Sequence, residues 1–268
     1  MKIGVIGNIS KIKDESVLDK LMQSLQEWGY ESVRFSSHKE IAGVDVVVVL
    51  GGDGAILHAA VVAAQKNVKI IGVNYGNLGF LTEYERGEEN RLHTLLDQLS
   101  KNSCRILRRS MLEIGVKGKT YYALNEVALQ RDYAAFTSLD SQMLTLRVEV
   151  GEGSNVLLGD GMLMCTPTGS TAYSLSAGGA ILSPEAPVVM MTPICPFSFN
   201  ARSTVFPDTD CFTVEVEKGN ALVLIDGKTV APLFSKQQIT IKKAPFTADF
   251  PLCDGFDFMG KIRNKLNK

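Results

Sequence analysis

The feature that most constrains the fold of this chain is a change in the spacing of its apolar residues near residue 100. Before that point, short apolar runs alternate with segments whose apolar residues recur every three or four positions, which is typical of buried strands and amphipathic helices. After it, apolar and polar residues alternate one by one, as in antiparallel strands with one buried face. The sequence therefore predicts an α/β domain over residues 1–100 and an all-β or β-rich domain over residues 101–250.

The N-terminal half contains the elements of an α/β domain. The expected strands are Lys2 to Gly7, Asp45 to Leu50 and Lys69 to Val73. The expected helices are one over 17–28 that Asp14 can cap, one over 54–65 and one over 88–99. Strands that alternate with helices favour a parallel sheet with helices on its faces.

The C-terminal half shows the alternation of one-sided strands. Leu144 and Leu146, for example, are separated by Thr145. Strand-like runs recur at 104–116, 120–130, 142–150, 154–158, 161–166, 211–217, 221–225 and 238–242. The chain closes with a helical pattern over 256–266, which we expect to pack back on the N-terminal domain.

Composition and charge exclude several classes of protein. Of the 268 residues, 45% are hydrophobic and 21% charged, so the chain can bury a sizeable core and is not disordered. Its 28 basic and 29 acidic residues give a formal charge of −1, which offers no bulk attraction for nucleic acid or an anionic membrane. The sequence lacks a signal peptide and any apolar run of ~18 residues, so we expect a cytoplasmic protein. Together with the charge, this leads us to expect that it binds neither nucleic acid nor membrane.

The strongest local signal is the segment Gly51-Gly52-Asp53-Gly54, where an expected strand turns into an expected helix beginning near Ala55. The carboxyl ends of parallel strands are where α/β sheets bind ligands. Glycines let a phosphate approach the backbone, and a helix N-terminus favours negative charge. An aspartate there makes sense if it accepts a hydroxyl proton or holds a metal, as phosphoryl transfer requires. The alternative is a tight turn with an aspartate cap.

A second polar segment lies in the C-terminal half. Gly159-Asp160-Gly161 is followed by residues 166–179, which include six Ser and Thr residues. This stretch is too polar for a core element, so we expect a loop that bonds to ribose, amide or phosphate groups. Asn125-Glu126 also interrupts an apolar strand, and a buried polar pair needs partners either in the protein or in a ligand.

Taken together, these segments resemble the NAD kinase family. The motifs are GGDG at 51–54, NLGFL at 77–81, LNE at 124–126, and GDG at 159–161 followed by TPTGSTAYSLSAGG at 166–179. GGDG is shared with lipid kinases and phosphofructokinases, whereas LNE and the hydroxyl-rich segment belong to the NAD kinases. The resemblance implies a Rossmann-like N-terminal α/β domain and a C-terminal β-rich domain that binds NAD and forms oligomers, the fold class shared with diacylglycerol kinases.

The resemblance also implies a reaction and the residues that perform it. Asp53 would be catalytic, activating the 2′-hydroxyl of the adenosine ribose of NAD, which attacks the γ-phosphoryl group of ATP with the help of a divalent metal ion such as Mg²⁺. The implied NAD-binding residues are Asp53, Gly54, His58, Asn125, Glu126, Asp160, Thr171, Ala172, Tyr173, Ser176 and Lys228, and the implied phosphate-binding residues are Gly51, Gly52 and Gly54. In some members the aspartate at Asp160 reaches NAD across a subunit interface, which implies a homodimer or homotetramer.

Two other functions stay open at this stage. A lipid kinase of the diacylglycerol or sphingosine type would use the same glycine-rich turn, but it leaves Asn125-Glu126 and the hydroxyl-rich segment unexplained. A non-catalytic dinucleotide-binding sensor would keep the pocket and lose phosphoryl transfer, with Ala55 as its sequence hint. The presence of Asp53 argues against the sensor.

Overall fold

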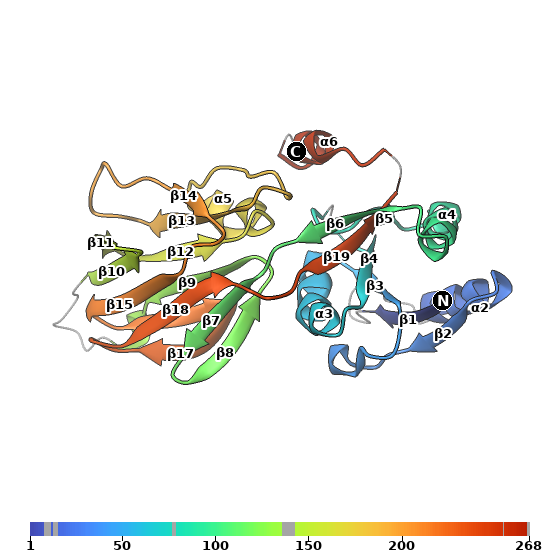
Figure 1. The fold of residues 1–268 in the computed structure, drawn as a ribbon, viewed down its shortest axis with the longest axis horizontal. Helices are drawn as coiled ribbons and strands as arrows, with labels where there is room; N and C mark the ends of the chain where they lie inside the picture. Colours follow the sequence, from blue (N-terminus) through green and yellow to red (C-terminus); the bar gives the residue numbers. More distant parts are fainter. Residues whose placement is uncertain (8–11, 13–15, 77–78, 136–142, 254, 267–268) are drawn as a thin grey trace. The chain divides into compact units, whose positions relative to one another are not determined.

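The computed structural model describes residues 1–7, 12, 16–76, 79–135, 143–253 and 255–266. The chain divides into two compact units, the first made of Met1–Arg108 and Phe246–Lys268 and the second of Arg109–Pro245 (Figure 1). The closing segment therefore belongs to the same unit as the N-terminus. The predicted cap Asp14, Asn77 and Leu78 of the NLGFL motif, and the predicted start of a strand at residue 142 lie outside the described residues.

The first unit contains a parallel sheet. Its strands are β1 (Lys2–Gly7), β2 (Glu31–Arg34), β3 (Val46–Gly51), β4 (Lys69–Asn74) and β5 (Tyr84–Glu85). Their order is β2-β1-β3-β4-β5, and their recorded pairings are parallel. Every residue of β3 is buried, which explains its unbroken apolar run. The four residues of β2 and the two of β5 are too few to show a period, so the sequence did not predict them.

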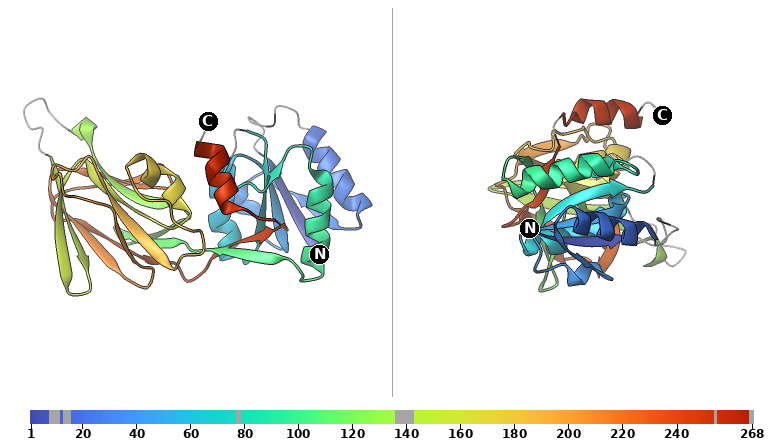
Figure 2. Two further views of the ribbon diagram at one scale, coloured as in Figure 1. Left: turned by 90° about the horizontal axis from the view of Figure 1, so that it is seen from above. Right: turned by 90° about the vertical axis from the view of Figure 1, so that its right-hand side faces the viewer.

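Helices cover both faces of this sheet (Figures 1 and 2). Among the described residues, the helices of the unit are η1 (His38–Glu40), α2 (Ser16–Glu27), α3 (Asp53–Gln65), α4 (Glu89–Ser100) and α6 (Phe258–Leu266). On one face, Leu18 of α2 and Leu95 of α4 share a buried cluster with Val48. On the other, α3 packs so closely that a Cβ at Gly72 would lie 2.4 Å from Ile56.

A short two-stranded sheet completes the first unit. It pairs β6 (Arg105–Arg109) with β19 (Ala248–Leu252), and β19 also contacts β4 and α3. The run expected as one strand over 104–116 is therefore broken between β6 and β7 (Leu112–Val116). None of the helices in the described part of the chain combines the length and the apolar character needed to cross a bilayer.

The second unit contains two antiparallel six-stranded sheets, ordered β11-β10-β15-β18-β7-β8 and β14-β13-β12-β9-β16-β17. Besides β7, the strands are β8 (Lys119–Ala123), β9 (Glu126–Arg131), β10 (Leu144–Val150), β11 (Gly153–Gly159), β12 (Gly161–Cys165), β13 (Val188–Ile194), β14 (Thr204–Pro207), β15 (Phe212–Lys218), β16 (Ala221–Ile225), β17 (Lys228–Leu233) and β18 (Gln238–Lys243). The unit also contains η2 (Tyr133–Ala135), η3 (Gly169–Thr171) and α5 (Tyr173–Ser176). The β-rich fold expected here is present.

Three of these strands were not predicted, and each has a local reason. β13 is buried along almost its whole length and shows no alternation. β14 and β17 are the edge strands of their sheet and contain Pro207 and Pro232. Proline cannot donate to a strand ladder, so it weakens the sequence signal and suits an edge.

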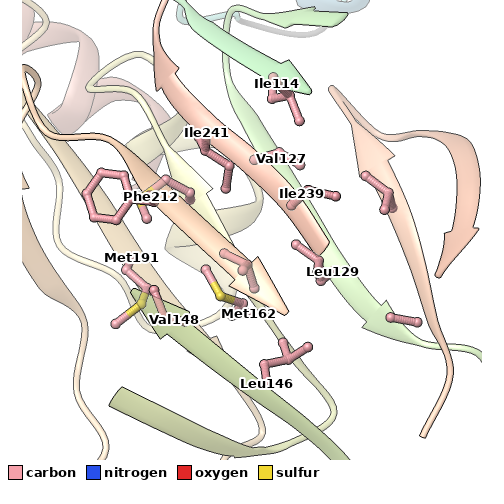
Figure 3. Packing of buried hydrophobic residues seen from close by; sticks show 14 of the residues in the cluster. Ile114, Val127, Leu129, Leu146, Val148, Met162, Met191, Phe212, Ile239 and Ile241 are labelled. Atoms are coloured by element: carbon pink, nitrogen blue, oxygen red, sulfur yellow. The ribbon is translucent and has the colours of Figure 1, made fainter. Parts of the chain in front are cut away.

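The core of the second unit lies between its two sheets (Figure 3). Leu146, Val148 and Phe212 of one sheet meet Leu129 and Met162 of the other. The outer face of the second sheet forms a separate buried cluster, with Ala128, Leu163 and Cys165 against Tyr173, Ala177 and Leu182. The hydroxyl-rich segment thus covers the face of β9 that points away from the core.

Candidate active site

Asp53 is the first residue of α3, directly after the N-cap Gly52. The sequence predicted that this helix begins near Ala55, but it begins two residues earlier, at Asp53. The Asp53 side chain does not cap its own helix. Instead, its Oδ2 accepts a hydrogen bond from the backbone N–H of Phe80 at 2.8 Å, and its Oδ1 accepts one from Leu81 at 3.0 Å. The carboxylate thus fixes the described part of the loop that follows β4.

Gly79 makes this contact possible. A Cβ at position 79 would lie 2.1 Å from Oδ1 of Asp53 and 2.9 Å from Oγ1 of Thr82. The Asp53 side chain nevertheless remains 29% exposed. Two backbone donors use only part of the acceptor capacity of a carboxylate. Asp53 is therefore oriented by the protein and can still accept a proton from a bound molecule.

The glycines beside Asp53 are not required by the fold. A Cβ at Gly52 or Gly54 would have no atom within 4 Å, and the φ of Gly52 is −103°, which other residues also adopt. Neither packing nor backbone strain thus demands glycine here, whereas close approach of a ligand to the helix N-terminus would. Gly51 is the buried last residue of β3. His58 is exposed on α3, and its ring meets that of His38 at 5.5 Å between centroids.

In the second unit, Asn125 and Glu126 are buried where β8 turns into β9, and a carboxylate holds this turn. Oδ2 of Asp226 accepts from the N–H of Leu124 at 2.9 Å, and its Oδ1 accepts from Asn125 and Glu126 at 2.8 and 3.1 Å. The N–H of Asp226 in turn donates to the carbonyl of Glu126 at 3.0 Å. Sequence reasoning missed Asp226, although Asp226-Gly227 between two apolar runs is a hairpin signal.

The hydroxyl-rich segment packs directly on this turn. The hydroxyl of Thr166 donates to the carbonyl of Leu124 at 2.6 Å, and its N–H donates to that of Asn125 at 2.9 Å. A Cβ at Gly169 would lie 2.1 Å from the carbonyl oxygen of Asn125, so only glycine fits. The structure therefore brings the LNE motif together with the start of the segment that leads to Thr171, Ala172 and Tyr173.

Several hydroxyls of this segment support the protein rather than face a ligand. Ser170 donates to the carbonyl of Pro167 and accepts from the N–H of Leu182, while Ser174 bonds to Thr192. The expectation that the segment is too polar for the interior is wrong for four residues, Thr166, Thr168, Ser170 and Ser174, which are buried. In contrast, Thr171, Ala172 and Tyr173 are partly exposed, and Ser176 is exposed.

Glu126 has an unusual electrostatic environment. Its Oε2 is buried without a hydrogen-bond partner among the described residues. Burial and the negative charge of Asp226 raise the pKa of Glu126 to about 8, although a hydrogen bond from the Tyr173 backbone opposes this. Burial also raises the pKa of Asp226, against its three backbone bonds and the charge of Lys228. The raised pKa favours the protonated carboxyl of Glu126, which can donate a hydrogen bond to a ligand.

Asp160 lies away from this cluster within one chain. In the ladder between β9 and β12, Gly161 pairs with Gln130 and Cys165 with Glu126. Asp160 directly precedes Gly161, at the other end of β12 from Cys165 and its partner Glu126. At about 3.3 Å per residue, the separation between Asp160 and Glu126 along the strands is roughly 15 Å. Its carboxylate pairs with Arg131 at 3.6 Å.

Replacing the turn-holding carboxylate tests its structural role. In Asp226→Asn, an amide N–H₂ must face a backbone N–H, so we expect the free energy of unfolding to fall by about 1–3 kcal/mol. Urea titration of the variant measures this, with Asp210→Asn, a change in another turn of the same unit, as the control. Equal stability of Asp226→Asn and the wild type would contradict the assignment.

The raised pKa of Glu126 predicts a pH-dependent stability. Between about pH 5 and pH 8 the unfolded chain loses this proton while the folded chain keeps it, so stability falls as the pH rises. Glu126→Gln cannot ionise, and its unfolding free energy relative to the wild type should therefore increase over this range. Denaturant titrations at pH 5, 6, 7 and 8 would measure it. A difference that does not change with pH would show that Glu126 ionises normally.

Comparison with known proteins gives this chain a family. The family profile of the ATP-NAD kinase N-terminal domain matches residues 7–104, and that of the ATP-NAD kinase C-terminal domain matches residues 124–251. The NAD kinase of Thermoanaerobacter sp. is 33% identical, with 100% of this chain and 99% of that protein covered. The NAD kinase of Caldicellulosiruptor saccharolyticus is 32% identical, with 90% of each chain covered.

Solved structures show the same fold. Yeast NADH kinase complexed with NADH matches with a TM-score of 0.86 at 21% identity, covering 100% of this chain and 87% of that one. An NAD kinase from Archaeoglobus fulgidus in complex with ATP matches with a TM-score of 0.75 at 24% identity, covering 100% and 98%. The predicted fold class is confirmed. With both domain profiles and full-length relatives in agreement, the chain belongs to the NAD kinase family.

Proposed function

We propose that this chain is an NAD kinase, which transfers the γ-phosphoryl group of ATP to the 2′-hydroxyl of the adenosine ribose of NAD and so makes NADP. The observation that carries this proposal is the carboxylate of Asp53, which Phe80 and Leu81 orient and which stays partly exposed. Open space beside Gly52 and Gly54 leaves room for phosphate groups next to it. The relatives named NAD kinase, at 32% and 33% identity, support the same activity.

Asp53 would act as the proton acceptor in this reaction. The ribose oxygen forms a bond to the γ-phosphorus, the bond from that phosphorus to the β,γ-bridging oxygen breaks, and ADP leaves with the electron pair. The hydroxyl proton passes to Asp53. Phosphoryl transfer depends mainly on positioning and electrostatic stabilisation, and the backbone at Gly51, Gly52 and Gly54 would hold phosphate groups at the helix N-terminus.

Glu126 and Asn125 would recognise NAD. The carboxyl of Glu126, whose Oε2 has no partner among the described residues and whose pKa is raised, can donate to a ligand oxygen or ring nitrogen and accept from a hydroxyl, and an asparagine amide can do both. Further proposed contacts to NAD are those of Gly54, His58, Asp160, Thr171, Ala172, Tyr173, Ser176 and Lys228. The partly exposed side of residues 171–173, next to the LNE turn, supports this assignment.

A divalent metal ion would assist by screening the phosphates. The described residues include no cluster of three His, Cys, Asp or Glu side chains that could hold a metal by themselves. Mg²⁺ commonly binds through one or two carboxylates together with substrate phosphates and water. An ion of this kind would enter with ATP and be held mainly by its phosphate oxygens and by water.

The proposed role of Asp53 predicts the behaviour of Asp53→Asn. Loss of a positioned proton acceptor should lower turnover by about two to four orders of magnitude. NAD affinity should change far less. Purified protein is assayed with NAD, ATP and Mg²⁺ for NADP formation. Thermal unfolding of the variant checks that it remains folded without the hydrogen bonds from Phe80 and Leu81 to the carboxylate. Asp97→Asn, a surface carboxylate of the same unit, is the matched control.

The same assay separates the alternatives. Binding of NAD by the wild type without formation of NADP would indicate a sensor. Phosphorylation of diacylglycerol or sphingosine without NADP would indicate a lipid kinase. Near-normal turnover of Asp53→Asn would leave the kinase but remove Asp53 from its role.

We propose in addition that the chain forms a homodimer or homotetramer through an edge of the second unit. Exposed apolar side chains gather on β11, on the loop after β13 and on β14, and we call them the apolar edge patch: Val156, Leu158, Phe197, Phe199 and Val205. The N–H of Phe197 donates to the carbonyl of Leu158 at 2.8 Å, which joins the loop to β11. A groove of about 340 Å³ lies along this edge.

A second copy of the chain is the occupant that this edge suits. Phe199 is 95% exposed and Phe197 is 69% exposed, and exposed apolar side chains at a sheet edge invite pairing. Asp160 follows directly after β11, so the interface would carry it towards NAD bound mainly by the partner. This accounts for its distance from Glu126 within one chain.

Charged substitutions in the apolar edge patch test the assembly. We expect the double variant Phe197→Asp, Phe199→Asp to sediment as a monomer, because a buried carboxylate would be unpaired in the interface. It should also lose activity, because Asp160 would no longer reach NAD bound by the partner. Phe234→Asp, which changes an exposed aromatic residue outside the patch, is the control. Sedimentation velocity at the assay concentration measures both. A fully active wild-type monomer would refute the interface and the shared role of Asp160.

A further inference from the structure

The C-terminal helix α6 is anchored to Thr82 and Glu83, which follow the two residues whose N–H groups bind Asp53. The Nζ of Lys261 donates to the backbone carbonyl of Thr82 at 2.9 Å and pairs with the carboxylate of Glu83 at 2.5 Å. Glu83 is only 6% exposed at its side chain, so this pair lies inside the unit. The helix is therefore held in a defined position by the contact of the partly exposed Lys261 with the buried Glu83.

Lys265 lies one turn further along the same helix face, since residues four apart are neighbours on a helix. Its Nζ is 3.5 Å from Oδ2 of Asp53 and 4.0 Å from the centre of the Phe80 ring. The Phe80 side chain is buried and its N–H holds the same Asp53 oxygen. The ammonium of Lys265 is thus placed by the ring beneath it as well as by the carboxylate.

Asp53 does not need this lysine to be satisfied. Its two oxygens already accept from Phe80 and Leu81. The Lys265 side chain is still 31% exposed, and a partly exposed ion pair of this kind adds little to folding stability. The position of the charge next to the proposed proton acceptor therefore calls for a chemical explanation.

The geometry of phosphoryl transfer supplies one. A hydroxyl oxygen that gives its proton to Asp53 must lie within about 3 Å of the carboxylate, and the phosphorus it attacks lies about 3 Å beyond. The ammonium lies 3.5 Å from the same carboxylate on a flexible four-carbon stem, so it can reach the oxygens of that phosphoryl group. Negative charge is spread over those oxygens in the transition state.

We propose that Lys265 is a catalytic residue, whose ammonium contacts the transferring phosphoryl group and makes α6 part of the active site. This inference rests on the proposed NAD kinase function. It assigns a role in the chemistry to the closing helix, which no motif of the N-terminal or hydroxyl-rich segments includes. Lys261 is the positioning residue that sets the helix in place.

The test compares Lys265→Met, which keeps the aliphatic stem, with Lys265→Arg, which keeps the charge. We expect the methionine variant to lose about 100-fold in kcat, comparable to removal of one electrostatic donor from a transition state, with little change in NAD affinity or thermal unfolding. Arginine should restore most of the rate. Arg263→Met, a change of an exposed cation on the same helix, should behave as the wild type.

Chemical rescue adds a measurement that a structural role would not affect. Ethylammonium added to Lys265→Ala should raise turnover in a saturable way, whereas tetramethylammonium, which cannot donate a hydrogen bond, should not. An unchanged kcat in Lys265→Met, or a loss that follows a lower unfolding temperature and resists rescue, would overturn the proposal while the wild type remains an NAD kinase. A wild type that makes no NADP would overturn both.

Discussion

The carboxylate of Asp53 accepts hydrogen bonds from two backbone N–H groups of the loop after β4, and the site in the first unit depends on this contact. Parallel pairing brings the ends of β3 and β4 side by side, but it does not determine how their loops meet. Gly79 leaves the space that the carboxylate needs. Because one side of Asp53 stays exposed, the group that orders the loop can also serve in chemistry.

In the second unit, another carboxylate also holds a turn by accepting hydrogen bonds from backbone N–H groups. Asp226 accepts from three consecutive N–H groups of the LNE turn and places Glu126 in an apolar, negatively charged environment. This arrangement costs stability, since the buried Oε2 of Glu126 has no hydrogen-bond partner among the described residues. Perturbed acids of this kind gather at functional sites, where a ligand completes their hydrogen bonding.

Much of the fold followed from hydrophobic spacing, and the family from short motifs. Elements with a clear period were predicted, including α3, α4 and β10, within one or two residues of their observed ends. β13 failed because burial on both faces removes alternation, and β14 and β17 failed because edge strands tolerate proline. Composition could not separate the hydroxyls of residues 166–179, because a Ser or Thr bonded to the backbone looks the same in sequence as one that faces a ligand.

The sequence by itself determined the two periods, the membership in the NAD kinase family and the place of Asp53 at a strand-to-helix junction, because each depends on residues that are neighbours along the chain. Only the tertiary structure decided that Asp226 holds Asn125 from 101 residues away, that Ser170 faces inward and that Lys265 meets Asp53. Hydrogen bonds and ion pairs between distant residues leave no local period or spacing in the sequence. They form only when packed strands and helices have already fixed the distance between the two groups.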